Sequence, residues 1–300
     1  MTEAGGLASM DDGARIRWRR LGRRGSGEPP VVLLHGGPGL PDYLEDVAAA
    51  VADLAPVHRY DQRGTGGSEW RGCHTLARHV RDLAGLLDLW EAPRAMLVGH
   101  SYGSDLACRF CLAHPERVAG MLLMCGPFVG DWRAGYRRER ARRMSAAERD
   151  RLRALEERTH RTADEEAELL TLAWSTDHAE PVRGRSRAAR AAVRRRPVNW
   201  DMNRELGAEG RTDPLAPHLD TLRVRLPERT EIIGADRAPR PLTALASLAH
   251  RLGVPLTCVE DAGHEPWLEQ PETVRGHLRR FVRAGGTTWA GDEGARDGAV

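Results

Sequence analysis

The sequence predicts an α/β fold in which a mostly parallel sheet is covered by helices on both faces. Short, continuous apolar runs recur along the chain, as expected of strands that are buried on both sides. Segments of helical length separate these runs, and this alternation is typical of parallel strands joined by crossover helices. After residue 128 the apolar runs stop until residue 229, which predicts an all-helical insertion within the sheet fold.

The first part of the predicted core spans residues 1–128. Residues 1–12 are expected to be flexible, and the alternation at 14–18 predicts an early antiparallel strand. Further strands are predicted at 31–34, 57–61, 95–98 and 118–125, and helices at 43–54, 76–90 and 102–114. In the helix at 76–90 the apolar residues recur at three- and four-residue steps, so one face should pack on the sheet.

The insertion at 129–228 is polar and rich in arginine. Its arginine runs, at 137–143 and 194–196, suggest an anionic ligand, but acidic residues are interleaved with them. Solvated helix faces that carry ion pairs are therefore the favoured interpretation. The second part of the core is predicted at 229–285, and the glycine-rich, polar residues 286–300 are expected to form a flexible tail.

A candidate nucleophile lies where the strand at 95–98 meets the helix that follows it. Residues 99–103 read Gly-His-Ser-Tyr-Gly, the G-x-S-x-G pattern. A serine at the apex of such a sharp turn is exposed at the end of the sheet, and the flanking glycines avoid clashes of a β-carbon with backbone. Ser101 is therefore predicted to be the nucleophile.

A serine hydroxyl needs a histidine to remove its proton and a carboxylate to orient that histidine. Downstream, a predicted strand at 229–235 leads to Asp236, and another at 255–261 leads to His264. The chain order Ser, Asp, His is that of the α/β-hydrolases. We therefore predict His264 as the base and Asp236 as the acid, although Asp220 and Asp261 lie nearby in the sequence.

An oxyanion hole is predicted after the apolar run at 31–34. Residues 35–39 read His-Gly-Gly-Pro-Gly, and glycines there let backbone N–H groups approach a substrate oxygen. The N–H of Tyr102, the residue after the nucleophile, is the second expected donor. Within the loop we favour Gly37 over Gly36.

Three stretches carry a resemblance to a known family: residues 35–39, residues 60–68 (Tyr-Asp-Gln-Arg-Gly-Thr-Gly-Gly-Ser) and residues 99–103. The chain resembles the α/β-hydrolases, and among them the proline iminopeptidase group of serine peptidases. The resemblance covers residues 10–128 and 229–284. It implies an α/β-hydrolase fold in which the insertion after the sixth strand is a cap over the active site.

The resemblance also assigns roles near the site. It implies that the loop at 60–68 braces the oxyanion turn, which begins at His35, through Asp61 and Arg63. His100 departs from the pattern, because iminopeptidases usually carry glycine there, whereas many esterases carry histidine. An iminopeptidase must bind the protonated amine of its substrate, and the group uses cap glutamates for this. Glu205 is the first candidate and Glu209 the second.

Aromatic residues of the insertion are candidates for a substrate pocket. Trp200 or Trp174 could line an apolar pocket for a proline ring, although packing in the protein core is the more common role of either residue.

Composition limits the other classes of function. The net charge of +2 is too small to indicate nucleic acid as a partner, and no apolar stretch is long enough to span a membrane. No secretory signal is evident, and five cysteines at unremarkable spacing fit free thiols in a reducing cytoplasm. A single C-x-x-C pair at 108–111 gives no zinc site, so neither a metal nor another cofactor is expected.

The sequence thus predicts a cytoplasmic serine hydrolase that acts on a small molecule or short peptide through an acyl-enzyme. The leading hypothesis is an aminopeptidase that releases N-terminal proline or another small residue. The alternative is a carboxylesterase or lactonase of the same mechanism. A further alternative, from another class, is a ligand-binding protein that keeps the fold without turnover.

Overall fold

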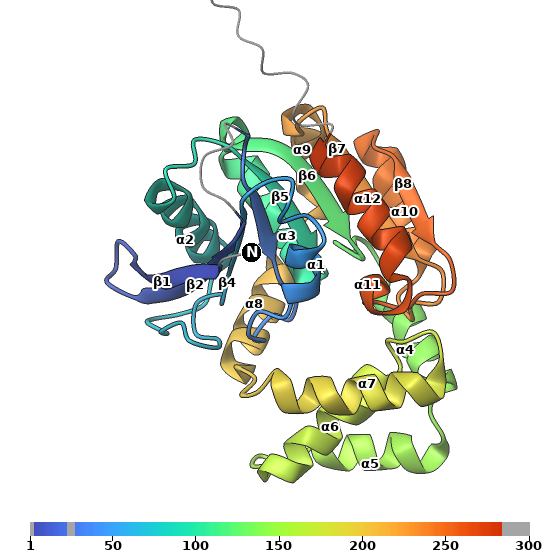
Figure 1. The fold of residues 1–300 in the computed structure, drawn as a ribbon. Helices are drawn as coiled ribbons and strands as arrows, with labels where there is room; N and C mark the ends of the chain where they lie inside the picture. Colours follow the sequence, from blue (N-terminus) through green and yellow to red (C-terminus); the bar gives the residue numbers. More distant parts are fainter. Residues whose placement is uncertain (1–2, 23–27, 284–300) are drawn as a thin grey trace, which may run out of the picture.

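The computed structural model describes residues 3–22 and 28–283, which form one twisted eight-stranded sheet flanked by helices (Figure 1). The predicted tail at 286–300 lies outside the described residues. In space the strands follow the order β1 (Glu3–Ser9), β2 (Arg15–Leu21), β4 (Val57–Tyr60), β3 (Val31–Leu34), β5 (Ala95–His100), β6 (Val118–Met124), β7 (Thr230–Ala235) and β8 (Leu256–Val259).

The sheet is antiparallel at one edge and parallel elsewhere. Strand β2 pairs antiparallel with both β1 and β4, while the strands from β4 to β8 run parallel. The expectation that residues 1–12 are flexible is wrong, because β1 occupies most of them. Most of its side chains are exposed, so backbone pairing rather than an apolar pattern builds this strand.

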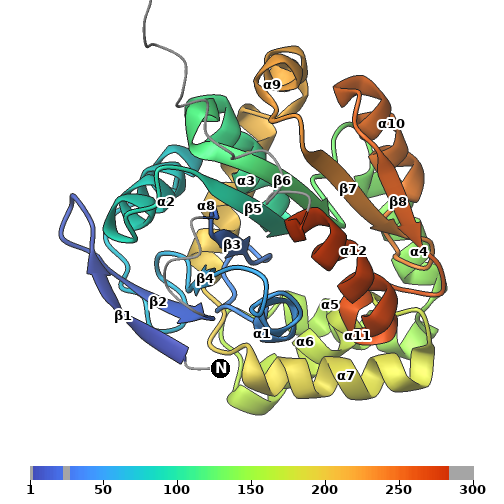
Figure 2. The same ribbon diagram turned by 45° about the horizontal axis from the view of Figure 1, so that its top comes forward.

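Two helical layers bury the parallel strands (Figure 2). Side chains that alternate along the strands form two separate apolar clusters; Val32 and Leu34 face one layer, and Val31 and Leu33 face the other. The first layer contains α2 (Leu76–Leu89), α3 (Tyr102–Ala113), α9 (Leu219–Arg225) and α10 (Leu242–Leu252). The second contains α1 (Glu45–Ala49), α11 (Pro266–Glu269) and α12 (Pro271–Arg283).

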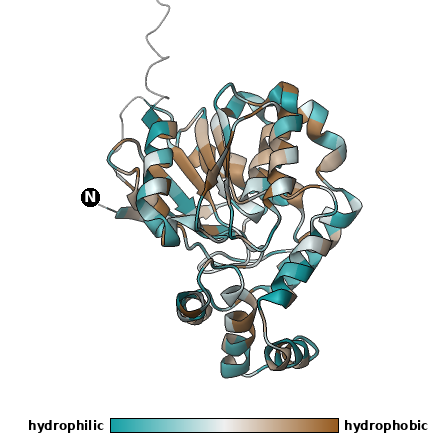
Figure 3. Cartoon of the chain, turned by 90° about the vertical axis from the view of Figure 1, so that its right-hand side faces the viewer, coloured by the Kyte–Doolittle hydropathy of each residue, from teal (hydrophilic) through white to brown (hydrophobic). Residues whose placement is uncertain are grey.

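The segment between β6 and β7 is helical throughout. It contains α4 (Arg133–Arg142), α5 (Ala146–Glu156), α6 (Ala163–Ser175), α7 (Pro181–Arg194) and α8 (Trp200–Thr212) before α9. Helices α5, α6 and α7 share a small apolar cluster of their own, which includes Leu155 and Leu170. Their outer faces are hydrophilic, whereas the strands of the sheet are mostly hydrophobic (Figure 3).

Candidate active site

Ser101 lies at the turn between β5 and α3, where its backbone has a φ of 54°. A non-glycine residue rarely adopts this conformation, so the surrounding structure must hold it. The two flanking glycines make the turn possible. A β-carbon at Gly99 would lie 2.5 Å from the Gly103 carbonyl oxygen, and one at Gly103 would overlap the Leu34 carbonyl. Helix α3 therefore packs directly on β3, and this close packing fixes the serine at the end of the sheet.

His264 is close enough to Ser101 to act as its base. Its Nε2 lies 3.0 Å from Ser101 Oγ, and its backbone N–H donates to the Asp177 carbonyl at 2.6 Å. The imidazole is buried. Burial, followed by the nearby Arg240 guanidinium, holds the pKa of His264 well below its usual value. At neutral pH the ring is thus uncharged, as a general base must be.

The predicted acid is not bonded to this base. Asp236 Oδ1 accepts a long hydrogen bond from the Ala262 N–H at 3.4 Å, and Oδ2 lies 3.5 Å from Arg237 Nε. The Nδ1 atom of His264 is buried and has no hydrogen-bond partner among the described residues. The structure therefore corrects the expectation that Asp236 orients the histidine, because the carboxylate is drawn toward its neighbour Arg237.

The two alternative acids lie on the surface. Asp220 pairs with Arg251 at 3.5 Å and is 88% exposed, and Asp261 lies 3.4 Å from Arg237 and is 74% exposed. Within the described part of the chain, then, the nucleophile and base are assembled as a pair without a carboxylate on Nδ1.

The oxyanion loop lies against the nucleophile. A β-carbon at Gly36 would be 2.9 Å from the Ser101 β-carbon. The Gly36 N–H donates to the Tyr43 hydroxyl at 2.9 Å, whereas the Gly37 N–H has no partner among the residues described. Gly37 has a φ of 133°, a conformation that favours glycine. Together with the Tyr102 N–H, in the first turn of α3, the Gly37 N–H can bind a substrate oxyanion.

His100 links the oxyanion loop to the loop of the base. Its Nδ1 accepts a hydrogen bond from the Tyr43 hydroxyl at 2.7 Å, and its Nε2–H donates to the His264 carbonyl at 2.8 Å. Because Tyr43 also accepts from Gly36, one chain of hydrogen bonds runs from loop to loop. Burial lowers the pKa of His100 to about 4, so its ring is neutral and this arrangement of protons is stable.

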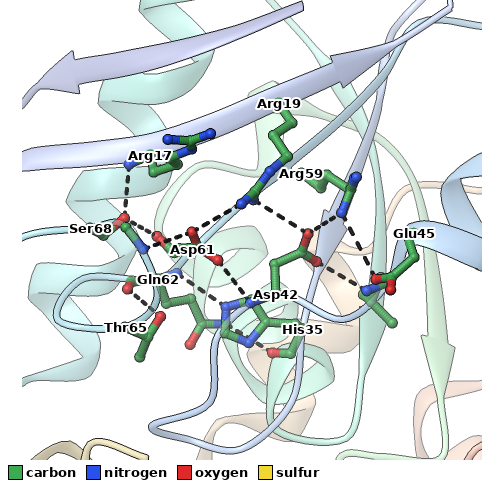
Figure 4. A network of polar contacts seen from close by, with 12 residues as sticks. Arg17, Arg19, His35, Asp42, Glu45, Arg59, Asp61, Gln62, Thr65 and Ser68 are labelled. Atoms are coloured by element: carbon green, nitrogen blue, oxygen red, sulfur yellow. Dashed lines mark hydrogen bonds and ion pairs between the residues drawn. The ribbon is translucent and has the colours of Figure 1, made fainter. Parts of the chain in front are cut away.

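The other predicted supporting residues lie in the neighbouring loops (Figure 4). His35 donates from Nδ1 to the Gly36 carbonyl at 2.9 Å and accepts the Gln62 N–H at Nε2 at 3.1 Å. Asp61 accepts the N–H groups of Asp42, at 2.9 Å, and of Gly67, at 3.0 Å. His35 and Gln62 therefore hold the loop at 60–68 against the oxyanion turn.

Arg63 points elsewhere, which corrects its expected role. The side chain is completely buried and donates to both oxygens of Asp82 and of Asp12. These partners lie in α2 and in the turn between β1 and β2. Arg63 therefore joins the edge hairpin to the helical layer and does not contact the oxyanion loop.

A cavity of about 70 Å³ lies over Ser101, and charged pairs surround it. Arg195 donates to both oxygens of Glu265, and Arg240 Nη1 donates to Asp177 Oδ1 at 2.8 Å. Burial alone would raise the pKa of Glu265, but Arg195 lowers it to about 2. Each carboxylate of the cavity is thus paired with an arginine.

The predicted amine-binding glutamates do not line this cavity. Glu205 accepts the His74 N–H at 2.6 Å, and Glu209 accepts the Leu76 N–H at 2.7 Å, so both hold the start of α2. Trp200 also lies elsewhere, since its indole N–H donates to Glu166 at 2.6 Å. The structure corrects all three expectations. Trp174 does line the cavity.

The sequence analysis missed the charged residues of the cavity. Glu265 directly follows the base, which is a signal that could have placed it near the site. Arg195 and Arg240 carried no such signal, because each reaches the cavity through its place in the fold.

In the described ranges, no group of three or more His, Cys, Asp or Glu side chains could hold a metal ion. The helices of the same ranges include none with the length and apolar character to cross a membrane.

Curated proteins with different activities match part of the chain. A proline iminopeptidase of Heyndrickxia coagulans is 34% identical over 37% of this chain and 39% of its own length. Epoxide hydrolase B of Mycobacterium tuberculosis is 36% identical over 34% of this chain and 30% of its own length. The chain thus matches well under half the length of either relative.

A solved structure matches the fold as a whole. The esterase from Exiguobacterium antarcticum superposes with a TM-score of 0.72 at 16% identity, covering 93% of this chain and all of the esterase. Finally, the family model for the alpha/beta hydrolase fold matches residues 29–219, most of the chain. The chain therefore belongs to the α/β hydrolase fold family.

Proposed function

We propose that the protein is a serine hydrolase that cleaves a carboxylic ester or amide through an acyl-enzyme. The observation that carries this proposal is the 3.0 Å contact between Ser101 Oγ and the neutral Nε2 of His264. His264 takes the hydroxyl proton as Ser101 attacks the carbonyl carbon, and the Gly37 and Tyr102 N–H groups bind the oxyanion. His264 then gives the proton to the leaving group, and the same base activates water to release the acid.

A serine nucleophile does not fit the hydrolysis of epoxides, the reaction in the name of one curated relative. Attack of a serine hydroxyl on an epoxide would form an ether, which water does not cleave, so the enzyme would not turn over. Attack on an ester or amide forms an ester instead, and an activated water cleaves it. Acyl substrates are therefore the class that fits Ser101.

Among acyl substrates, the charges of the cavity favour an ester or lactone. A buried ammonium needs a carboxylate partner. Glu265 and Asp177 already pair with arginines, and Glu205 and Glu209 lie outside the cavity. Release of an N-terminal proline is the second candidate, which the partial likeness to proline iminopeptidases favours. It would require Glu265 to leave Arg195 and bind the substrate amine.

The test compares short-chain nitrophenyl esters with proline and alanine anilides, using wild type and Ser101→Ala. Ester hydrolysis that is lost in Ser101→Ala supports the carboxylesterase proposal. Hydrolysis confined to the proline anilide would favour the peptidase instead. A serine-directed phosphonate should label wild type at Ser101. Failure of labelling together with no turnover would reject both candidates and favour a protein that only binds ligands.

A further inference from the structure

A second, larger cavity adjoins the active site on the side of α7. Its volume is about 460 Å³, which is within the range of small-molecule binding sites. The walls come from the helices α7, α1 and α11 and from the strands β2 and β4. Helix α7 runs alongside α1 and α11 (Figures 1 and 2). We call this cavity the arginine cleft.

Arginine is the most frequent residue in the lining of the cleft. Six of its thirteen lining residues are arginines and three are acidic. Arginine is far less frequent in the chain as a whole, where arginine and lysine together account for 45 of 300 residues. The cleft is thus enriched about threefold in arginine, and the high arginine content of the protein does not by itself account for it.

Five of the six arginines of the cleft have a carboxylate partner. Arg187 lies 3.0 Å from Glu269, and Arg195 pairs with Glu265. Asp42 lies 2.6 Å from Arg59 and 3.9 Å from Arg19, and Figure 4 shows both contacts. Glu45 lies 3.2 Å from Arg194 and 4.0 Å from Arg59. These two carboxylates are therefore already neutralised, and each shares its charge between two guanidinium groups.

Two arginines of the cleft keep donors for a ligand. Arg190 donates to the Ser186 hydroxyl at 2.7 Å and has no carboxylate within ion-pair distance in the part of the chain that the structure describes. Arg194 is 75% exposed and contacts Glu45 through Nη2 alone, at 3.2 Å. Planar guanidinium groups bind phosphate and carboxylate through paired N–H donors, so the cleft suits an anion.

The cleft shares a wall with the catalytic cavity. Tyr43, Ala191 and Arg195 line both cavities. A substrate whose scissile bond lies at Ser101 could therefore extend past Arg195 into the cleft.

We propose that the arginine cleft is a substrate subsite that binds a phosphate or carboxylate group remote from the bond that Ser101 cleaves. This inference rests on the proposed hydrolase function. It assigns the substrate to the class of anionic esters or amides, in which the charged group lies on the leaving-group side or at the far end of the acyl chain.

The test measures substrate preference with two pairs of esters. Phenyl acetate and 3-acetoxyphenyl phosphate differ by an anion on the leaving group. Nitrophenyl butyrate and the nitrophenyl monoester of glutarate differ by an anion on the acyl chain. The test variant is Arg190→Glu. The matched control is Arg183→Glu, which makes the same charge change at an exposed position of the same helix outside the cleft.

The measured quantity is kcat/KM for the anionic ester divided by kcat/KM for the neutral ester. In at least one pair, Arg190→Glu should lower this ratio by about tenfold, because the substitution replaces an attraction between the arginine and the anion with a repulsion. The ratio should stay the same in Arg183→Glu. Comparing ratios between variants removes the intrinsic reactivity of each ester. Unchanged ratios in both pairs, or an equal change in Arg183→Glu, would overturn the subsite.

Calorimetric titration with inorganic pyrophosphate separates a substrate subsite from a site for a free anion. Binding that weakens about tenfold in Arg190→Glu, together with a lower ester ratio, supports the proposal. Binding that weakens while both ester ratios stay unchanged overturns the substrate subsite in favour of a free anion. If wild type cleaves neither esters nor anilides, the proposed function fails, but the titration still tests the cleft. In that case, pyrophosphate binding to wild type that is lost in Arg190→Glu supports an anion site. The absence of pyrophosphate binding to wild type overturns it.

Discussion

Replacing Tyr43 with Phe tests the hydrogen-bond chain that joins the oxyanion loop to the base. The change removes one oxygen atom and keeps the ring, which stacks on Trp267 and lies under the Arg195 guanidinium. Two buried groups lose their partner: the Gly36 N–H at 2.9 Å and His100 Nδ1 at 2.7 Å. An unsatisfied buried group costs about 1–3 kcal/mol, so the free energy of unfolding should fall by about 2–4 kcal/mol.

Tyr102→Phe is the matched control for this change. The Tyr102 hydroxyl is also buried, but it has no hydrogen-bond partner among the described residues. Its removal leaves no group unpaired, and the backbone N–H that serves the oxyanion hole remains. The free energy of unfolding should therefore change by less than about 0.5 kcal/mol or rise slightly.

Urea denaturation followed by tryptophan fluorescence measures both variants, since the chain contains eight tryptophans. Ester kinetics provide a second readout. Loss of one oxyanion donor costs about 3 kcal/mol of transition-state stabilisation, and a loosened Gly37 should cost less, about a tenfold fall in kcat. If Tyr43→Phe and Tyr102→Phe unfold at the same urea concentration, the hydrogen-bond chain does not hold the loops as described.

Three further predictions concern the base, the acid and the insertion. Burial and, after it, Arg240 lower the pKa of His264, and only the neutral ring can act as a base. The fall of kcat/KM on the acid side of its pH profile should therefore lie below pH 6.5, the ordinary pKa of histidine. Arg240→Gln should move that fall to higher pH, and a fall that stays in place would exclude the guanidinium as a cause. Asp236→Asn should lower kcat less than tenfold, whereas loss of a carboxylate that orients the base lowers kcat about ten-thousandfold. A fall of the larger size would show that Asp236 orients His264 during catalysis. Glu205→Ala should lower the free energy of unfolding by about 1 kcal/mol without changing KM, because Glu205 holds the start of α2. A raised KM would instead indicate that Glu205 contacts the substrate.

The sequence predicted the parts of the fold that depend on local pattern. The strands at 31–34 and 95–100 are mostly apolar runs, and their pattern suffices because both of their faces are buried. The proximity of Ser101 and His264 could also be predicted. Ser101 needs glycines on both sides at its turn, and His264 follows a strand in the required order.

The carboxylates could not be assigned from the sequence. Asp236 lies 3.5 Å from its sequence neighbour Arg237, and the sequence does not show whether its carboxylate faces this guanidinium or His264, which is 28 positions away. Glu205 and Glu209 lie on α8, and docking of that helix on α2 turns them toward the N–H groups of His74 and Leu76. Glu265 and Arg195 are 70 positions apart, and no spacing rule predicts that they pair.

The short connection between α7 and α8 has a consequence for how a hydrolase with this structure could acquire new substrates. The Asn199 N–H donates to the Gly39 carbonyl at 2.8 Å, and its side-chain amide donates to the Gly64 carbonyl at 2.9 Å. A β-carbon at Gly39 would overlap the Asn199 carbonyl. The connection is thus fastened to the same glycine-rich turn that supplies an oxyanion donor. Mutations there would alter turnover and selectivity together, so adaptation to a new substrate is easier through the outer helices α5 and α6.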